Sequence, residues 1–172
     1  PNTRYSAIYP DPPWSYRNKG TRAAADRHYS TMSIEDIKAL PVDEIAAEDC
    51  VLFLWATFPM LREALETIEA WGFRYKTLAF CWAKRNRSGK GWFCGLGNWT
   101  RSNPEICLFA KKGHPQRVSA AVHSIIEAPV GKHSEKPKDV RKRIVELMGD
   151  VPRIELFARE RATGWDAWGD EV

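Results

Sequence analysis

The sequence has no long hydrophobic run. Its longest uninterrupted apolar stretch is Val51–Ala56 (VLFLWA), far shorter than the roughly 20 residues that a membrane helix needs. The first residues, beginning Pro1–Arg4, also lack the apolar core of a secretory signal. We therefore expect a cytoplasmic protein that does not contact a membrane.

Cysteine and histidine are scarce and scattered. The chain has four of each, and the cysteines form no C-x-x-C pair, so the spacing indicates neither a disulfide framework nor a zinc site. Half of the cysteines lie in apolar, strand-like runs, and we predict that all of them are reduced and that no metal is bound. They are Cys50, Cys81, Cys94 and Cys107, and the histidines are His28, His114, His123 and His133.

Glycine and proline are not enriched, and neither sign of charge is in large excess. The 172 residues include 11 of each, with 44% apolar residues, 28% charged residues and a net charge of +4. These values exclude collagen-like, disordered and low-complexity chains, and the length is sufficient to bury a core. Because there is no internal repeat and no linker-like stretch, we predict a single domain over residues 1–172.

The apolar pattern predicts strands alternating with helices. Val51–Ala56 is apolar at every position, as in a strand buried on both faces, and Pro137–Met148 has apolar residues on one helical face. This alternation favours an α/β fold with a mostly parallel central sheet flanked by helices. Further strands are predicted at 4–9, 77–83, 105–111, 124–127, 153–157 and 165–168, and further helices at 33–40 and 59–71.

Local signals mark the ends of two of these helices. Ser33 is followed three residues later by Asp36, which is typical of a helix N-cap, and Pro41 ends that helix. Gly72 directly follows the second helix and is predicted to terminate it.

Ligands of open parallel sheets bind at the carboxyl ends of the strands. This rule singles out the residues just after Tyr9, Trp55 and Phe157. The first of these places holds the tetrapeptide Asp11–Trp14 (DPPW), which is the strongest candidate for chemistry in the chain.

The tetrapeptide suits a planar ring that carries an exocyclic NH2 group. Its two prolines fix two φ angles and remove two N–H donors, so we expect the carbonyls around them to stay free as acceptors. Asp11 adds a carboxylate acceptor and Trp14 a flat apolar face. The alternative interpretation is a rigid turn with a buried tryptophan.

Five further segments accompany the tetrapeptide. They are His28–Ser33 (HYSTMS), Leu52–Trp55 (LFLW), Asn98–Leu108, His133–Pro137 (HSEKP) and Ile154–Arg159 (IELFAR). Together, and in this order, they resemble the motifs of the MTA-type (MT-A70-like) adenine N6-methyltransferases, in particular the bacterial and phage DNA methyltransferases. That family also includes the eukaryotic messenger-RNA adenosine methyltransferases, and the resemblance spans essentially the whole chain.

The resemblance implies a Rossmann-like class I methyltransferase fold in permuted motif order, with S-adenosylmethionine as methyl donor. The catalytic residues that it implies are Asp11, Pro12, Pro13 and Trp14. The cofactor contacts that it implies are Asp11, Lys136, Phe157, Arg159, Asp170 and Glu171. Asp170 stands where the family usually has asparagine, and a carboxylate can still accept hydrogen bonds from ribose hydroxyls. Without the resemblance, Lys136 would be read as a solvated lysine at a helix start.

Basic residues gather in one part of the chain. Residues 84–117 contain eight lysines and arginines against a single acidic residue, and Trp92, Phe93 and Trp99 are interleaved with them. We predict that the glycine-rich part, residues 84–103, is a mobile loop that contacts phosphates and stacks on bases. The expected substrate contacts are Arg85, Arg87, Lys90, Trp99, Arg101, Asn103 and Glu105, and the resemblance adds Tyr29 beside the target base. The alternatives are a solvated loop, a packing role for Tyr29, and a contact of the loop with a second copy or a partner subunit.

These observations predict an enzyme that methylates the N6 amine of adenine in nucleic acid. DNA is favoured over RNA because the chain is compact and resembles the bacterial and phage members. An RNA adenosine methyltransferase and a catalytically silent nucleic-acid-binding subunit of the same fold are the alternatives. The intact Asp11–Trp14 sequence argues against the silent subunit, and the basic loop argues against a small-molecule or protein amine as substrate.

Overall fold

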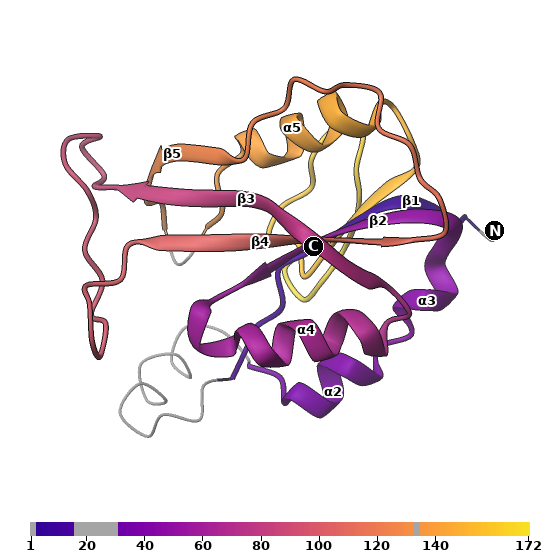
Figure 1. Cartoon of the computed structure of the whole chain (residues 1–172), viewed down its shortest axis with the longest axis horizontal. Coiled ribbons are helices and arrows are strands. Elements are labelled where there is room, and N and C mark those ends of the chain that lie inside the picture. Colours follow the sequence, from indigo (N-terminus) through magenta and orange to yellow (C-terminus); the bar gives the residue numbers. More distant parts are fainter. Residues whose placement is uncertain (1–2, 16–30, 133–134) are drawn as a thin grey trace.

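Strands and helices alternate along the chain, and the strands assemble into one seven-stranded sheet with helices on both faces (Figure 1). The computed structural model describes residues 3–15, 31–132 and 135–172. The strands are β1 (Tyr5–Pro10), β2 (Ala46–Ala56), β3 (Arg74–Arg85), β4 (Pro104–Lys112), β5 (Ile125–Pro129), β6 (Arg153–Leu156) and β7 (Asp166–Trp168). The helices are α2 (Ile34–Ala39), α3 (Val42–Ile45), the 3-10 helix η1 (Phe58–Met60), α4 (Leu61–Ala70) and α5 (Asp139–Met148).

The sheet has the order β5-β3-β4-β2-β1-β6-β7. Strand β4 pairs antiparallel with both β2 and β3, and the other pairings are parallel. Six of the seven described strands therefore point the same way, which confirms the predicted α/β fold. Because of this arrangement, the carboxyl ends of those six strands lie along one edge of the sheet, and β4 begins at that same edge.

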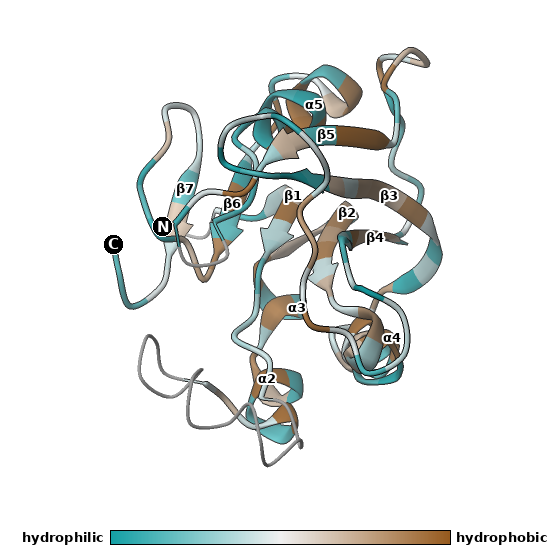
Figure 2. Ribbon diagram, turned by 90° about the vertical axis from the view of Figure 1, so that its left-hand side faces the viewer, coloured by the Kyte–Doolittle hydropathy of each residue, from teal (hydrophilic) through white to brown (hydrophobic). Residues whose placement is uncertain are grey.

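The central strand β2 is buried on both faces, as its continuous apolar sequence predicted. Leu52 and Leu54 pack in the cluster that includes side chains of α2 and α4, whereas Phe53 and Trp55 pack in the cluster that includes α5. Hydrophobic residues accordingly mark the central strands and the inner faces of the helices in Figure 2. The core is thus two apolar layers separated by the sheet.

The predicted helix ends are confirmed. The Oγ atom of Ser33 accepts a hydrogen bond of 3.1 Å from the backbone N–H of Asp36 at the start of α2. That helix ends at Ala39, just before Leu40, whose extended backbone suits a residue that precedes a proline. Helix α4 ends in front of Gly72, which has a φ of +84° that a side chain would disfavour.

Several predicted boundaries need correction. Strand β2 begins at Ala46 rather than Val51, because its first half is polar and partly exposed and so carries no continuous apolar signal. The short helix α3 between α2 and β2 was not predicted. Strand β6 ends at Leu156 rather than Phe157, whose φ of +60° lies outside the extended region. Within the described residues, no helix has the length and apolarity to cross a membrane.

Candidate active site

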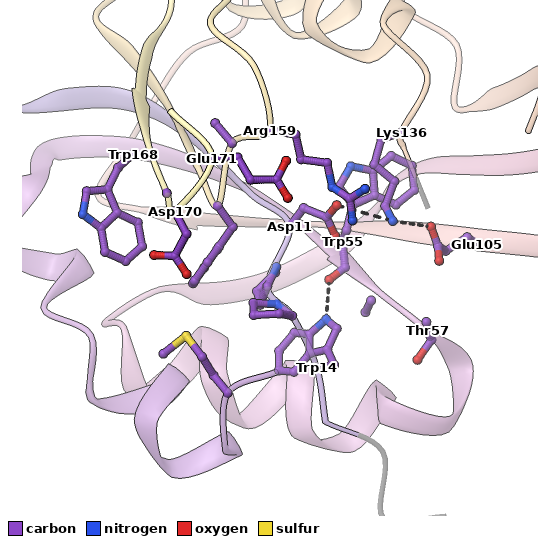
Figure 3. A pocket seen from close by; sticks show the side chains of 17 residues that line it. Asp11, Trp14, Trp55, Thr57, Glu105, Lys136, Arg159, Trp168, Asp170 and Glu171 are labelled. Carbon is purple, nitrogen blue, oxygen red and sulfur yellow. Dashed lines mark hydrogen bonds and ion pairs between the residues drawn. The ribbon is translucent and has the colours of Figure 1, made fainter. Parts of the chain in front are cut away.

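A cavity of about 360 Å³ lies at the edge of the sheet where the parallel strands end (Figure 3). Its walls come from the segments that follow β1, β2, β6 and β7, from the start of β4 and from the segment before α5. This is the edge at which open parallel sheets bind ligands. The lining residues are Asp11, Pro12, Pro13, Trp14, Met32, Trp55, Ala56, Thr57, Glu105, Lys136, Phe157, Ala158, Arg159, Trp168, Gly169, Asp170 and Glu171.

A network of buried charges forms one wall of the cavity. The Nζ atom of Lys136 lies 2.8 Å from a carboxylate oxygen of Glu105 and 3.4 Å from one of Asp11. The ammonium group also lies 5.4 Å from the centre of the Trp55 ring, within the range of a cation–π contact. The side chain of Lys136 is only 11% exposed, so its charge is held by the protein rather than by water.

Burial and neighbouring charges shift the pKa values in this network. Burial raises the pKa of Asp11, and the nearby ammonium group of Lys136 opposes that rise. Burial by itself lowers the pKa of Lys136, but the two carboxylates outweigh it and raise the pKa overall. At the far end of the network, the Nζ atom of Lys84 lies 3.9 Å from a carboxylate oxygen of Glu105. Burial lowers the pKa of Lys84. Lys136 is therefore a fixed positive charge beside Asp11.

The tetrapeptide is fixed by the strands beside it. The backbone N–H of Asp11 donates to the carbonyl of Leu156, at 3.2 Å. The indole N–H of Trp14 donates to the carbonyl of Trp55, at 3.0 Å, and the Trp55 indole donates to the hydroxyl of Tyr9, at 2.7 Å. These bonds hold the tetrapeptide rigidly against the ends of β2 and β6.

The structure corrects two expectations about the tetrapeptide. The carbonyl of Pro12 accepts from the N–H of Trp14 at 2.9 Å, and that of Pro13 accepts from Met32 at 3.1 Å, so neither is wholly free. Each keeps one lone pair for a ligand. Trp14 is only 6% exposed, which means that a small part of its ring reaches the cavity and no open stacking face is presented. The tetrapeptide is thus a rigid turn with a buried tryptophan that also forms a wall of the cavity.

The opposite wall depends on a close approach between β6 and β7. The N–H of Ala158 donates to the carbonyl of Trp168 at 3.0 Å, and the rings of Phe157 and Trp168 meet edge to face at 5.3 Å. A Cβ atom on Gly169 would lie 2.9 Å from backbone atoms of Ala158, so only glycine fits there. This packing places Arg159 and the two acidic residues after Gly169 on the cavity.

The structure brings the predicted catalytic and cofactor residues together. All of them line the cavity, and so does one predicted substrate contact, Glu105. The other predicted substrate contacts in the described part of the chain lie at the end of β3 or on the β3–β4 loop, and they do not line the cavity. They are Arg85, Arg87, Lys90, Trp99, Arg101 and Asn103. Tyr29 lies outside the described residues.

The loop residues differ in their availability to a substrate. The guanidinium group of Arg85 pairs with Glu127 at 2.9 Å and lies 3.7 Å from the centre of the Trp92 ring. Arg85 is therefore already engaged at the base of the loop. In contrast, Arg87, Lys90 and Arg101 are exposed and form no ion pair within the described part of the chain.

Comparison with protein families identifies the family of this chain. The MT-A70 family model matches residues 5–171. The chain belongs to the MT-A70 family. Its seven-stranded, mostly parallel sheet flanked by helices is consistent with a Rossmann-like methyltransferase fold, as the resemblance implied.

Individual relatives of this MT-A70 protein come from bacteria and eukaryotes. The type II methyltransferase M.MunI of a Mycoplasma species is 34% identical over 192 residues, which cover 100% of this chain and 79% of the relative. The human N(6)-adenosine-methyltransferase catalytic subunit METTL3 is 27% identical over 178 residues, and an MT-A70-like N(6)-adenosine-methyltransferase of Arabidopsis thaliana is 26% identical over 176 residues. In both eukaryotic relatives the match covers 98% of this chain, which spans only 28% and 24% of their lengths.

Sequence reasoning missed several residues that line the cavity of this MT-A70 chain. Trp55 is the second-last residue of β2, Thr57 follows that strand, and Trp168 is the last residue of β7. The strand-end rule had pointed to the position after Trp55 without naming a residue. Trp168 carried no such signal, because only the pairing of β7 with β6 brings it to the cavity.

No metal site is evident in the described ranges, 3–15, 31–132 and 135–172. They contain no group of three or more histidine, cysteine or acidic side chains that could hold an ion. The four cysteines are free thiols, and burial raises the pKa values of Cys50 and Cys107. Neither of these buried thiols is therefore suited to act as a nucleophile.

Proposed function

We propose that this protein transfers a methyl group from S-adenosylmethionine to the N6 amine of adenine in nucleic acid, with DNA as the main substrate. The observation that carries the proposal is the buried Asp11 carboxylate in a rigid tetrapeptide, on a cavity wall and beside the fixed charge of Lys136. Membership of the MT-A70 family and the activities for which the relatives are named support the same reaction.

The tetrapeptide supplies acceptors, which is what the N6 amine requires. The lone pair of this amine is delocalised into the adenine ring, so the amine is a poor nucleophile. The Asp11 carboxylate and the second lone pair of the Pro12 carbonyl are suited to accept one hydrogen bond each from the two N–H groups of the amine. These bonds would hold the nitrogen in position. Positioning and electrostatics can then account for most of the acceleration.

Methylation also requires the amine to release one proton. Asp11 is a suitable first acceptor, because burial raises the pKa of this carboxyl above its ordinary value. Lys136 limits the rise, and it thereby keeps the carboxyl ionised and able to accept hydrogen bonds. No covalent intermediate with the protein is needed.

The residues around the cavity fit S-adenosylmethionine, which when bound supplies an electrophilic methyl group on a sulfonium sulfur. Its amino-acid end can lie near Asp11 and Lys136, where the ammonium group of Lys136 is suited to neutralise its carboxylate. Its ribose hydroxyls can be held by Arg159, Asp170 and Glu171, which line the same cavity. Figure 3 shows the Arg159 side chain reaching toward Asp11 and Lys136. The apolar rings of Phe157 and Trp168 are available to its adenine.

DNA is proposed as the main substrate because the bacterial relative, a type II methyltransferase, matches over the whole of this chain. RNA is the alternative, because METTL3 and the Arabidopsis relative are N(6)-adenosine-methyltransferases. The substrate contacts of the loop and of Tyr29, a subunit contact and the cytoplasmic location all stay predictions.

The test is the transfer of a radiolabelled methyl group to DNA and RNA oligomers of matched sequence, followed by digestion and separation of the nucleosides. We expect the label in N6-methyldeoxyadenosine, and none when Asp11 is replaced by alanine. Label in adenosine of the RNA alone would support the alternative. Label in cytosine, or in neither polymer, would exclude the proposed function.

A further inference from the structure

Two apolar side chains at the end of the β3–β4 loop are almost fully exposed. Trp99 is 99% exposed and Leu96 is 94% exposed. Large apolar side chains that are exposed together on one segment are typical of an interaction site. We call residues 95–102 the loop tip.

The backbone of the loop tip is folded tightly, so the exposure is built into its structure. The N–H of Gly95 donates to the carbonyl of Ser102 at 2.6 Å, which closes the tip. A Cβ atom on Gly95 would lie 2.9 Å from that carbonyl oxygen, and one on Gly97 would overlap the carbonyl oxygen of Thr100. Both positions therefore need glycine, and the turn that they allow leaves Leu96 and Trp99 in solvent.

The base of the loop is anchored to the sheet. Arg85 lies against the ring of Trp92 and pairs with Glu127 of β5, and the N–H of Phe93 donates to the carbonyl of Lys84 at 2.9 Å. These contacts join the loop to the ends of β3 and β5. The tip is consequently presented from a fixed base.

The loop leaves the sheet at the same edge as the cavity. It starts where β3 ends and returns where β4 begins, and Figure 1 shows it extending outward from those strands. Glu105, the second residue of β4, lines the cavity. A polymer that contacts the loop tip can therefore extend along this edge toward the cavity.

The positive charge of the loop indicates which class of polymer binds to it. Residues 86–103 contain three basic residues, Arg87, Lys90 and Arg101, and no acidic residue. A cationic loop that presents apolar side chains is complementary to a nucleic acid, whose phosphates attract the cations and whose bases can stack on an aromatic ring. Architectural proteins use apolar wedges of this kind to open base steps in a duplex.

We propose that Trp99, with Leu96 on the same loop tip, is a wedge that enters the base stack of a paired nucleic acid and stabilises the displacement of the target adenine. This inference rests on the proposed function. An adenine inside a duplex cannot place its amine against Asp11, so the base must leave the stack before it can react. A ring that fills the vacated space lowers the cost of that step.

The experiment compares two duplexes that differ only in whether the target adenine is paired or faces an abasic site. We expect Trp99→Ala to lower kcat/KM on the paired duplex by roughly 5- to 150-fold, the range for the loss of one aromatic stacking contact. On the unpaired adenine the loss should be under about threefold, because no base pair has to be broken and the base leaves the helix at a lower cost. Trp99→Phe should restore most of the activity. Tyr75→Ala, an exposed aromatic near the other end of β3 (46% exposed), is the matched control.

A readout without methyl transfer separates the wedge from the proposed function. With 2-aminopurine at the target position, binding of the wild-type protein should raise the fluorescence of the paired duplex, and Trp99→Ala should abolish that rise. No rise with the wild type, or an equal loss of activity on both duplexes, would overturn the wedge. So would a change in sedimentation of Trp99→Ala without DNA, because it would assign the tip to a subunit contact. A fluorescence rise without methylation of either duplex would overturn the proposed function and leave the wedge standing.

Discussion

The cavity and the β3–β4 loop both carry positive charge at the same edge of the sheet, but they hold it in different ways. Lys136 is buried between Asp11 and Glu105, whereas Arg87, Lys90 and Arg101 are exposed. A buried, paired charge is fixed before a ligand arrives and is little affected by salt, while exposed charges attract a polyanion from a distance and are screened. The comparison indicates that the cavity positions reacting groups and the loop collects the polymer.

The largest effect that would test this comparison is expected at Asp11. Replacing it with alanine removes the carboxylate that faces the reacting amine, and we expect the single-turnover rate to fall by about 10²- to 10³-fold, as for other lost electrostatic contacts to a transition state. Cofactor affinity, measured by calorimetry, should change much less. Asp43→Ala, at an exposed position of α3, is the control. A turnover near that of the wild type would refute the assigned role.

The next effect concerns the cofactor. Lys136→Ala and Arg159→Ala should each weaken binding of S-adenosylmethionine by about 1.5–3 kcal/mol, the range for a hydrogen bond to a charged group. Lys138→Ala is a close control, because Lys138 follows two residues later but is 70% exposed and pairs with Glu160, at 3.8 Å. Titration calorimetry that finds unchanged affinity in both test variants would remove them from the cofactor site.

A smaller effect is expected in the loop. The double replacement Arg87→Ala and Lys90→Ala should reduce the slope of log K against log salt for DNA binding by roughly 0.9 for each lost phosphate contact. It should weaken binding to all sequences alike and leave cofactor affinity unchanged. Arg85→Ala should reduce the slope less, because Arg85 is already paired with Glu127. If the double variant keeps the wild-type slope, the loop does not contact phosphates.

The smallest expected effect is a shift in the pH dependence of the rate. The carboxyl group of Asp11 must be ionised to accept a hydrogen bond from the amine and then its proton. Burial raises the pKa of this carboxyl group. The rate should therefore fall on acidification at a higher pH than an ordinary aspartate would give. Since Lys136 lowers the pKa of Asp11, Lys136→Met should move the fall to still higher pH. The measurement is the single-turnover rate against pH, at cofactor concentrations that saturate each variant, and a shift in the opposite direction would contradict it.

Local sequence signals account for much of the fold. The continuous apolar run of β2, the Ser33 cap and the position of Gly72 each depend on a few neighbouring residues, and the structure confirms all three. The early start of β2 and the helix α3 were missed because their polar residues have no distinctive period. The break at Phe157 was missed because a positive φ at a residue other than glycine is imposed by its surroundings.

The sequence by itself determined the alternation of strands and helices, the tetrapeptide after β1 and, through its ordered motifs, the family. These properties depend on short segments of the sequence. The conformational preferences of single residues and their neighbours are sufficient to predict them. The tertiary structure alone decided that Lys136 lies between Asp11 and Glu105, which are 125 and 31 residues away along the chain. It also decided that Trp14 is buried, that Arg85 is engaged by Glu127 and that Trp99 is left in solvent. Pairing and burial of this kind depend on which strands become neighbours, and no local pattern carries that information.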